Sequence, residues 1–235
     1  MKKTGRAPRR PLFVSFEGGE GVGKTTQIRL LAERLRAQGY AVTETREPGG
    51  GSLGKPIRKL LLDSRTRGLD PMAELMLMEA QRAQHVRDVI RPALDAGQVV
   101  LTDRYADSTT AYQGAGRGLD KALVASLNRA ATGGLEPDLT LLLDLPVEAG
   151  LRRARARNAD GPGDKEGRFE AEAVAFHDRV RKTFRALARS APRRFHVLRS
   201  DRPAEVIAAE VGELVEKRLA APARRARNDR RGARS

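Results

Sequence analysis

Residues 18–25 read Gly18-Gly19-Glu20-Gly21-Val22-Gly23-Lys24-Thr25 and match the pattern G-x-x-x-x-G-K-[ST]. Glycines let the backbone curl so that several N–H groups point inward at phosphate oxygens. The lysine adds a positive charge near the β- and γ-phosphates, and the threonine supplies a hydroxyl for Mg²⁺, which takes few protein ligands. The stretch therefore predicts a phosphate-binding loop for a nucleoside triphosphate, formed by residues 18–25 together with Thr26.

The residues on either side supply the context that this motif requires. Residues 12–16 form a short apolar run that is typical of a buried strand. Residues 24–38 then carry Ile28, Leu31 and Leu35 on one helical face, and Gly39 is a plausible C-terminal cap. A strand, a glycine-rich turn and a helix thus follow one another, and the positive N-terminal end of the helix faces the phosphates.

Short apolar strands alternate with helices along the rest of the chain. We expect further strands at residues 40–45, 99–102, 139–143 and 195–198, with a long helix at about 72–96. This alternation predicts an α/β fold with a five-stranded parallel sheet flanked by helices. Ligands of such folds bind at the carboxyl ends of the strands. Four residues follow strands at that edge: Gly18, Arg46, Asp103 and Asp144.

Composition sets limits on the class of protein. The chain has 235 residues, of which 40% are hydrophobic, enough for one compact domain. There is no cysteine, which excludes disulfides, thiolate metal sites and a cysteine nucleophile. The apolar stretches are far shorter than the roughly 20 residues of a membrane span. The basic start lacks the apolar run of a signal peptide, so we expect a cytoplasmic protein.

The formal net charge of +15 lies mostly at the two ends. Residues 1–10 hold five basic and no acidic residues, and residues 221–235 hold six arginines against one aspartate. We expect two disordered basic tails around a domain at residues 11–220. Such tails can touch nucleic acid, but charge runs of this kind are usually only solvated, so we do not expect that contact.

Among P-loop proteins, the sequence favours a small-molecule kinase. The Thr/Asn-Lys-x-Asp guanine signature of GTPases is absent from the sequence, and little chain remains for a mechanical domain. Several arginines also lie where a second, anionic substrate would bind.

Five further segments resemble those of bacterial thymidylate kinases. They are TREPGG at residues 45–50, IRKLLL at 57–62, AQRAQHV at 80–86, DRY at 103–105 followed by Ser108 and AYQG at 111–114, and the strand at 137–144. The match spans roughly residues 12–215. It implies a P-loop NTPase-type nucleoside monophosphate kinase that transfers the γ-phosphate of ATP, with Mg²⁺, to dTMP. The resemblance also implies a homodimer built partly on the helix at 72–96.

The resemblance assigns roles to residues at the matching positions. Arg104 and Arg58 would hold the dTMP phosphate, because a guanidinium fork matches phosphate oxygens. Asp103 and Thr25 would organise Mg²⁺ beside Lys24. The acceptor pocket as a whole would consist of Glu47, Pro48, Arg58, Met78, Arg82, Arg104, Ser108 and Gln113, with Arg82 at the thymine ring.

The transferring phosphate also needs a cation, and the variable loop positions 19–22 hold no arginine. The chain therefore resembles the subgroup that supplies arginines from a lid, here at about residues 150–170. Arg153 and Arg157 are four residues apart and share a helical face, and Arg168 stands at the far end. These three join Lys24, Asp103 and Arg104 as candidate catalytic residues. We expect residues 158–167 to be mobile, so that the lid can close and exclude water.

Two departures from the family pattern leave details open. Gly167 stands where the lid motif usually has aspartate, and Met78 stands where an aromatic residue commonly stacks on the base. A kinase of another monophosphate, such as dUMP or a guanine nucleotide, is the alternative function. A P-loop ATPase that binds nucleic acid through its tails is a second one, and it requires steeply salt-dependent binding. Residues 199–202 are a candidate adenine site by position alone.

Overall fold

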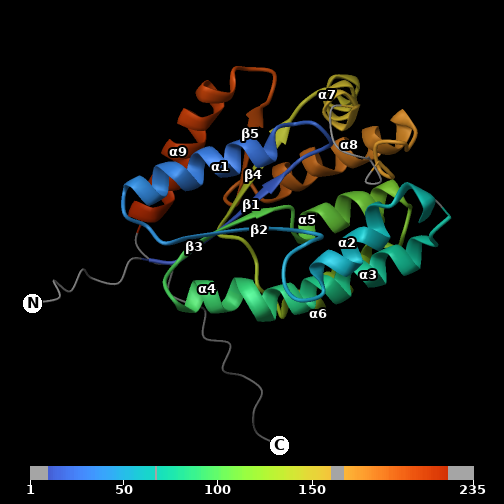
Figure 1. Ribbon diagram of the computed structural model, residues 1–235, viewed down its shortest axis with the longest axis horizontal. Coiled ribbons are helices and arrows are strands. Elements are labelled where there is room, and N and C mark those ends of the chain that lie inside the picture. Colours follow the sequence, from blue (N-terminus) through green and yellow to red (C-terminus); the bar gives the residue numbers. More distant parts are fainter. Residues whose placement is uncertain (1–9, 67, 160–166, 222–235) are drawn as a thin grey trace, which may run out of the picture.

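Five parallel strands form one sheet in the computed structural model, which describes residues 10–66, 68–159 and 167–221 (Figure 1). The strands are β1 (Leu12–Glu17), β2 (Val42–Arg46), β3 (Val99–Asp103), β4 (Leu139–Asp144) and β5 (Phe195–Arg199). Their spatial order is β2-β3-β1-β4-β5, and each neighbouring pair is parallel. The predicted five-stranded parallel sheet is therefore confirmed, with the P-loop leaving its central strand.

Helices connect the strands and cover both faces of the sheet (Figure 1). They are α1 (Lys24–Ala37), α2 (Gly54–Leu62), α3 (Pro71–His85), α4 (Arg91–Asp95), α5 (Ala106–Thr109), α6 (Lys121–Thr132), α7 (Val147–Ala159), α8 (Val174–Ser190) and α9 (Ala204–Ala220), together with the 3-10 turn η1 (Ser64–Thr66) and the π-helical turns η2 (Val86–Ile90) and η3 (Thr110–Gly116). Among the described residues, we find no helix with the length and apolar character that a membrane span requires.

The core fixes the central strand between two helical layers. All six residues of β1 are buried, and successive side chains point to opposite faces of the sheet. Val14 and Phe16 pack in one cluster with residues of α1 and α9. Phe13 packs on the other face with η2, α4 and Tyr105, whose ring it meets edge-on at 5.0 Å. The P-loop thus leaves a strand that is held from both sides.

The predicted long helix at 72–96 is interrupted. It consists of α3, the π-helical turn η2 and α4 in direct succession. Pro92 occupies the first turn of α4 and has no N–H to donate to the preceding turn, which explains why regular α-helix does not run through. The side chain of Asp88 in the widened turn accepts hydrogen bonds from Ser52 and Gln84.

Other boundaries differ by one or two residues from those expected. Strand β2 begins at Val42 rather than Tyr40, because the N–H of Tyr40 still bonds to the Leu35 carbonyl at the end of α1. Helix α7 runs to Ala159 and so includes the first residues of the predicted mobile loop, whose residues 160–166 lie outside the described residues. Most of both basic tails also lies outside them. Arg10 is an exception, since it donates to the Arg218 and Ala221 carbonyls.

Candidate active site

The P-loop folds around the ammonium group of Lys24, which is buried. Its Nζ donates to the carbonyl oxygens of Gly19 at 3.0 Å and Gly18 at 3.3 Å. Burial, together with the nearby charge of Arg104, lowers the pKa of Lys24. Gly23 has φ 90°, a left-handed conformation that glycine adopts without strain, so α1 can begin directly behind the loop. The loop thus holds a positive charge at a helix N-terminus, which is the arrangement that binds phosphate.

Thr25 and Asp103 meet at the open side of this loop. Thr25 Oγ1 donates to Asp103 Oδ2 at 3.1 Å, and Asp103 Oδ1 lies 4.0 Å from Lys24 Nζ. Asp103 is the last residue of β3, the strand beside β1. A hydroxyl and a carboxylate at this place fit Mg²⁺, which usually keeps several waters and takes few protein ligands. The two residues predicted at the metal are therefore together.

Arg104 follows β3 in a strained backbone conformation. Its φ is 71°, which is uncommon for a residue other than glycine and concentrates at functional sites. The turn is held by Glu17, whose carboxylate accepts hydrogen bonds from the N–H of Tyr105 at 2.8 Å and from Ser108 Oγ at 2.6 Å. The guanidinium group of Arg104 consequently points at the P-loop, where it donates to the Gly18 carbonyl at 2.8 Å.

The carboxylate of Glu20 faces Arg104 from within the P-loop. Glu20 Oε1 lies 2.9 Å from the Arg104 guanidinium and accepts a hydrogen bond from the Tyr112 hydroxyl at 2.7 Å. Burial alone would raise the pKa of Glu20, but the charges of Arg104 and Lys24 outweigh it and hold that pKa at about 2. Arg104 also lies over the Tyr112 ring, 4.7 Å from its centroid.

Arg82 is fully buried in a network of carboxylates on the other side of Arg104. Its Nε donates to Glu47 and its NH1 donates to Glu79 and Asn128, each at 2.8 Å. Burial opposes the charge of Arg82, but the carboxylates of Glu47 and Glu79 raise its pKa above the ordinary value. Within the described residues, Arg82 NH2 has no hydrogen-bond partner, and neither does Glu79 Oε2.

Gln113 belongs to η3 and lies against Glu74, near the end of α3 opposite to Arg82. Its Nε2 donates to Glu74 at 2.7 Å, while its Oε1 is buried and lacks a hydrogen-bond partner among the described residues. Glu74, Met78 and Arg82 follow one another at intervals of four residues and therefore share one face of α3. Met78 is buried between the two polar ends, against Ile57 and Leu61.

The remaining acceptor residues surround this face. Arg58 on α2 donates to the Pro48 carbonyl at 2.9 Å, and the peptide bond before Pro48 is cis. Ser108 lies within hydrogen-bond distance of Arg104, with Oγ and NH1 3.3 Å apart. Glu47 is buried and occupied by Arg82 and His85, so it reaches the pocket through Arg82 rather than directly.

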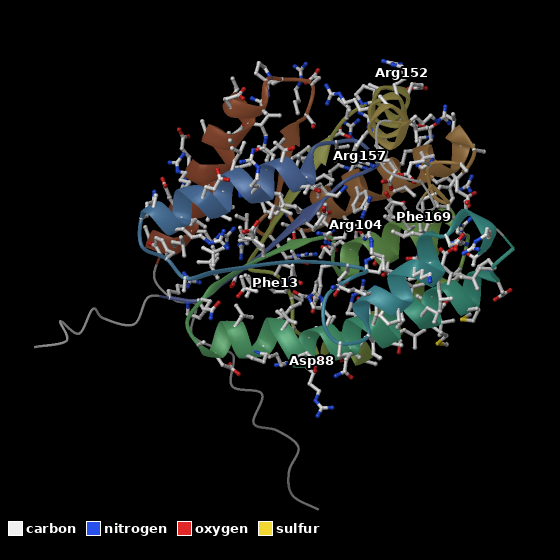
Figure 2. The ribbon with its side chains drawn as sticks, viewed as in Figure 1. Phe13, Asp88, Arg104, Arg152, Arg157 and Phe169 are labelled. Atoms are coloured by element: carbon white, nitrogen blue, oxygen red, sulfur yellow. The ribbon has the colours of Figure 1, made fainter. Side chains whose placement is uncertain are left out.

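The three lid arginines have different surroundings. Arg153 on α7 donates to the Ser200 carbonyl in the loop after β5, which is the loop proposed for adenine by position. Arg157 is mostly exposed and lies 3.5 Å from Glu170. Arg168 is buried, with donors on the Leu61 and Thr66 carbonyls and on Glu74. Figure 2 shows Arg157 and Arg152 on α7, with Arg152 on its outer side.

Comparisons with known proteins point to one family. The thymidylate kinase family profile matches residues 16–211. A thymidylate kinase from Desulfovibrio desulfuricans is 56% identical over 206 residues, which cover 87% of this chain and 95% of that protein. One from Nitratidesulfovibrio vulgaris is 51% identical and is covered over its whole length by 91% of this chain.

The chain belongs to the thymidylate kinase family. A crystal structure of thymidylate kinase from Ehrlichia chaffeensis has 32% sequence identity and a TM-score of 0.71, covering 88% of this chain and 99% of that one. The predicted fold class, the predicted enzyme class of nucleoside monophosphate kinase and the resemblance to the family are thereby confirmed. The roles of individual residues stay predictions.

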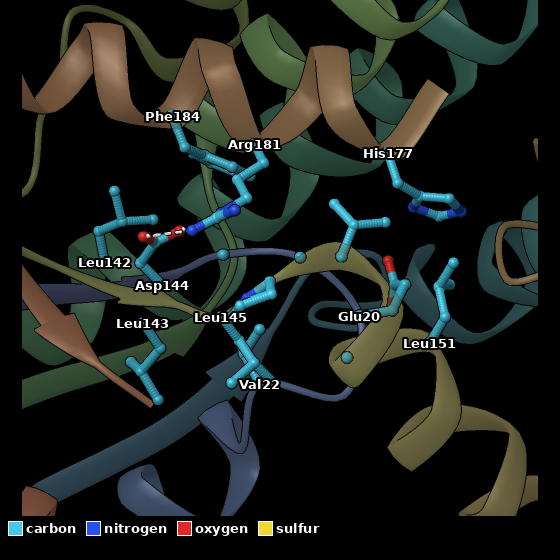
Figure 3. Close-up of a pocket in the computed structure, with 15 residues that line it drawn as sticks. Glu20, Val22, Leu142, Leu143, Asp144, Leu145, Leu151, His177, Arg181 and Phe184 are labelled. Carbon is cyan, nitrogen blue, oxygen red and sulfur yellow. Dashed lines mark hydrogen bonds and ion pairs between the residues drawn. The ribbon is translucent and has the colours of Figure 1, made fainter. Parts of the chain in front are cut away.

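The P-loop of this thymidylate kinase family member lines one side of a small cavity (Figure 3). It lies between the end of β4, α7 and α8, and its volume of about 20 Å³ suits roughly one water molecule. Asp144 at its edge is paired with Arg181 at 2.7 Å, so this carboxylate is occupied although it follows a strand. The cavity is too small for a nucleotide.

The residues that orient the predicted ones were not among those expected from the sequence. Glu17, Glu74 and Glu79 are buried carboxylates, each bonded to a side chain or backbone group of the site. His85 bonds to Glu47 through Nδ1 and to Thr45 through Nε2. The available signal was the charge of Glu74 and Glu79 on the face of α3 that also carries Met78 and Arg82, since charged residues are rarely buried without partners.

Proposed function

We propose that the protein transfers the γ-phosphate of ATP to the 5′-phosphate of dTMP, giving dTDP and ADP. Family membership supports this reaction, and the P-loop with Lys24 and Thr25 supplies the donor side. The acceptor side rests above all on two of the buried polar atoms that lack a hydrogen-bond partner among the described residues.

This pair consists of a hydrogen-bond donor, Arg82 NH2, and an acceptor, Gln113 Oε1. Buried polar groups in proteins are rarely left without a partner, so unpaired ones indicate a ligand. The edge of thymine presents a carbonyl oxygen beside a ring N–H, which complements one donor and one acceptor. Cytosine presents the reverse order. The base would lie over Met78, whose sulfur is polarizable and packs well against a ring.

The phosphate groups would meet between Lys24, Arg104 and the lid. Phosphoryl transfer depends mainly on positioning and on neutralising charge, so converging cations carry most of the catalysis. Arg104 and Arg58 would hold the acceptor phosphate, and Arg157 would reach the transferring group when the lid closes. Arg153 lies instead beside the loop after β5 and would serve the donor nucleotide.

Mg²⁺ would be held by Thr25 and Asp103, which already lie within hydrogen-bond distance of each other. Mg²⁺ held at these two residues would supply positive charge that neutralises the phosphates during transfer. The ammonium group of Lys24 would then leave its carbonyl partners in the loop and bind phosphate oxygens in their place. The carboxylate of Asp103 would orient the waters of the metal.

The test is ADP formation with ATP and Mg²⁺, with dTMP, dUMP, dCMP, dAMP and dGMP offered one at a time. We expect strong turnover with dTMP, weaker turnover with dUMP and very little with the other three. Turnover with a purine monophosphate in preference to dTMP would contradict the proposed acceptor pocket.

Uracil has the same polar edge as thymine, so dUMP is excluded only through the missing methyl group. One methyl group in an apolar pocket contributes about 1–3 kcal/mol of discrimination. We therefore expect a preference for dTMP over dUMP of roughly 10- to 200-fold. Equal use of both would show that the pocket recognises the 5-methyl group weakly, and a preference for dUMP would favour the alternative function.

We also propose that the protein acts as a cytoplasmic homodimer. Exposed apolar side chains lie on and beside α2 and α3, namely Leu53, Leu60 and Met76. A subunit interface on α2 and α3 would cover these exposed apolar side chains. Light scattering on the purified protein measures the mass directly. A monomer at micromolar concentration would contradict the dimer.

A further inference from the structure

The carboxylate of Glu74 holds three side chains that come from two distant parts of the chain. Gln113 Nε2 donates to Oε1 at 2.7 Å, while Arg117 and Arg168 contact Oε2 at 3.1 and 2.6 Å. Glu74 has no exposed surface. Among the described residues, these three side chains supply the polar partners of the Glu74 carboxylate.

The two guanidinium groups decide what Glu74 can do. They neutralise its charge inside the protein, where an unpaired carboxylate would be costly. An ionised carboxylate offers only acceptors, so any further partner must donate to it. Gln113 can satisfy Glu74 only with its NH2 group. Its carbonyl oxygen must then point the other way.

We propose that Glu74 is a positioning residue that fixes the orientation of the Gln113 amide and thereby makes the acceptor site select a base with a ring N–H. This inference rests on the proposed function, because it assumes that Gln113 Oε1 faces the base. Glu74 does not touch the substrate. Its role is to prevent the amide flip that would present NH2 to the base and favour a ring nitrogen without a proton.

The geometry of α3 supports a positioning role for Glu74 and a base-binding role for Gln113. Glu74 and Arg82 stand two helical turns apart on one face, with Met78 between them. Arg82 NH2 and Gln113 Oε1 are both buried and unpartnered among the described residues. A donor and an acceptor on either side of Met78 would select one polarity of base edge. Glu74 fixes the orientation of the Gln113 amide, which is the acceptor of this pair.

The test compares dTMP with 5-methyl-dCMP, which has nearly the same shape and the opposite polarity at these positions. The measured quantity is the ratio of kcat/KM for the two substrates in the wild type, Glu74→Gln, Gln113→Ala and the double variant. We expect Glu74→Gln and Gln113→Ala each to lower the ratio at least about tenfold. Because Glu74 acts through Gln113, the double variant should lose no more than the worse single variant.

The control is Glu172→Gln. Glu172 is the second carboxylate on Arg117, at 2.7 Å, and it does not contact Gln113. This variant should leave the ratio within about twofold of the wild type, since surface ion pairs contribute little. A change as large as that of Glu74→Gln would mean that the ratio responds to any loss of charge around Arg117, and would overturn the inference.

Glu74→Asp provides a second test if Glu74→Gln does not fold. Aspartate still offers only acceptors, so the ratio should stay within about threefold of the wild type even if KM rises. A ratio as low as that of Gln113→Ala would show that packing rather than charge matters, and would overturn the inference. The inference would also be overturned if Glu79→Gln, and none of the other variants, removed the preference for dTMP over 5-methyl-dCMP. In that case Glu79 Oε2, rather than Gln113 Oε1, would be the acceptor that binds the ring N–H.

The failure of the proposed function looks different. If the wild type itself used 5-methyl-dCMP as well as dTMP, the base would not be selected by Arg82 and Gln113 at all. A second outcome is that the wild type prefers dTMP over 5-methyl-dCMP, that Gln113→Ala loses this preference, and that Glu74→Gln keeps the wild-type ratio. The proposed function would then stand. Only the role of Glu74 would be wrong.

Discussion

Glu17 and Ser108 are 91 residues apart in the sequence, and their side chains meet at 2.6 Å inside the protein. The second oxygen of Glu17 accepts the N–H of Tyr105 at 2.8 Å. The strained residue Arg104 directly precedes the segment that these two contacts hold. A carboxyl group at the end of the central strand therefore fixes the turn that aims a guanidinium group at the P-loop.

Glu17 should make the stability of the protein depend on pH. Burial, and then the charge of Asp107, raise the pKa of Glu17 from 4.5 to about 8. The folded state then binds this proton more tightly than the unfolded chain, so the free energy of unfolding falls as pH rises from about 4.5 to about 8. Glu17→Gln carries no such proton. Relative to this variant, the wild type should lose stability across that window, by at most about 1.4 kcal/mol per pH unit.

Urea unfolding of both proteins at several pH values between 5 and 9 measures this difference. Glu33→Gln is the control, because Glu33 lies on the exposed side of α1 with Arg29 as its partner. Its difference from the wild type should stay nearly constant. A constant difference for Glu17→Gln as well would show that Glu17 is charged in the folded protein throughout.

Arg104 combines a strained backbone with a side chain that we propose binds the acceptor phosphate, and two substitutions separate these properties. Both Arg104→Ala and Arg104→Gly remove the guanidinium group and should raise KM for dTMP strongly. At φ 71° alanine keeps the strain and glycine does not, so the glycine variant should be more stable by about 1 kcal/mol. Kinetics and thermal unfolding of the two variants check this. An alanine variant with normal KM for dTMP would refute the acceptor role of Arg104.

The sequence predicts best what is local. The P-loop, α1 and the strand before them lie within about 25 residues and carry their own turn chemistry, so their structure followed from residue types alone. Glu17 and Glu74 could not be found in this way, because their partners lie 39 to 94 residues along the chain. A glutamate at the end of a strand or within a helix looks solvated until the tertiary fold surrounds it.

The lid shows the same limit. Arg153, Arg157 and Arg168 look alike in the sequence, and only the fold separates them by their partners. Arg168 is buried against α2 and α3, which no periodicity could have indicated. The interruption of the long helix at Pro92 was in principle visible, since proline lacks the N–H that a helix interior needs.

Asp103 should control the use of Mg²⁺. Asp103→Asn keeps the shape of the side chain but removes the negative charge 4.0 Å from Lys24 and replaces one of the two acceptor oxygens by an NH2 group. We expect kcat to fall about 10²- to 10³-fold, the usual loss for one group that stabilises the transition state. The Mg²⁺ concentration for half-maximal rate should rise. Initial rates over a Mg²⁺ titration measure both quantities.

Asp144→Asn provides the matched control. Asp144 ends β4 on the other side of β1, but it is bound by Arg181 at 2.7 Å and not by the P-loop. Its substitution should leave the Mg²⁺ dependence unchanged. Equal effects of the two variants would argue against a specific metal site at Thr25 and Asp103.

The last prediction concerns Arg157. It is mostly exposed on α7 and lies near the far end of the lid at Glu170, so it has room to move toward a transferring phosphate. An arginine that meets this phosphate contributes about 10³-fold or more to the rate. Arg157→Ala should therefore lower kcat strongly and leave KM for dTMP within about twofold. Arg152→Ala, on the outer side of the same helix, should leave kcat unchanged (Figure 2). An unchanged kcat in Arg157→Ala together with a lower kcat in Arg153→Ala would contradict this role of Arg157. The arginine that meets the transferring phosphate would then be Arg153, which lies beside Ser200.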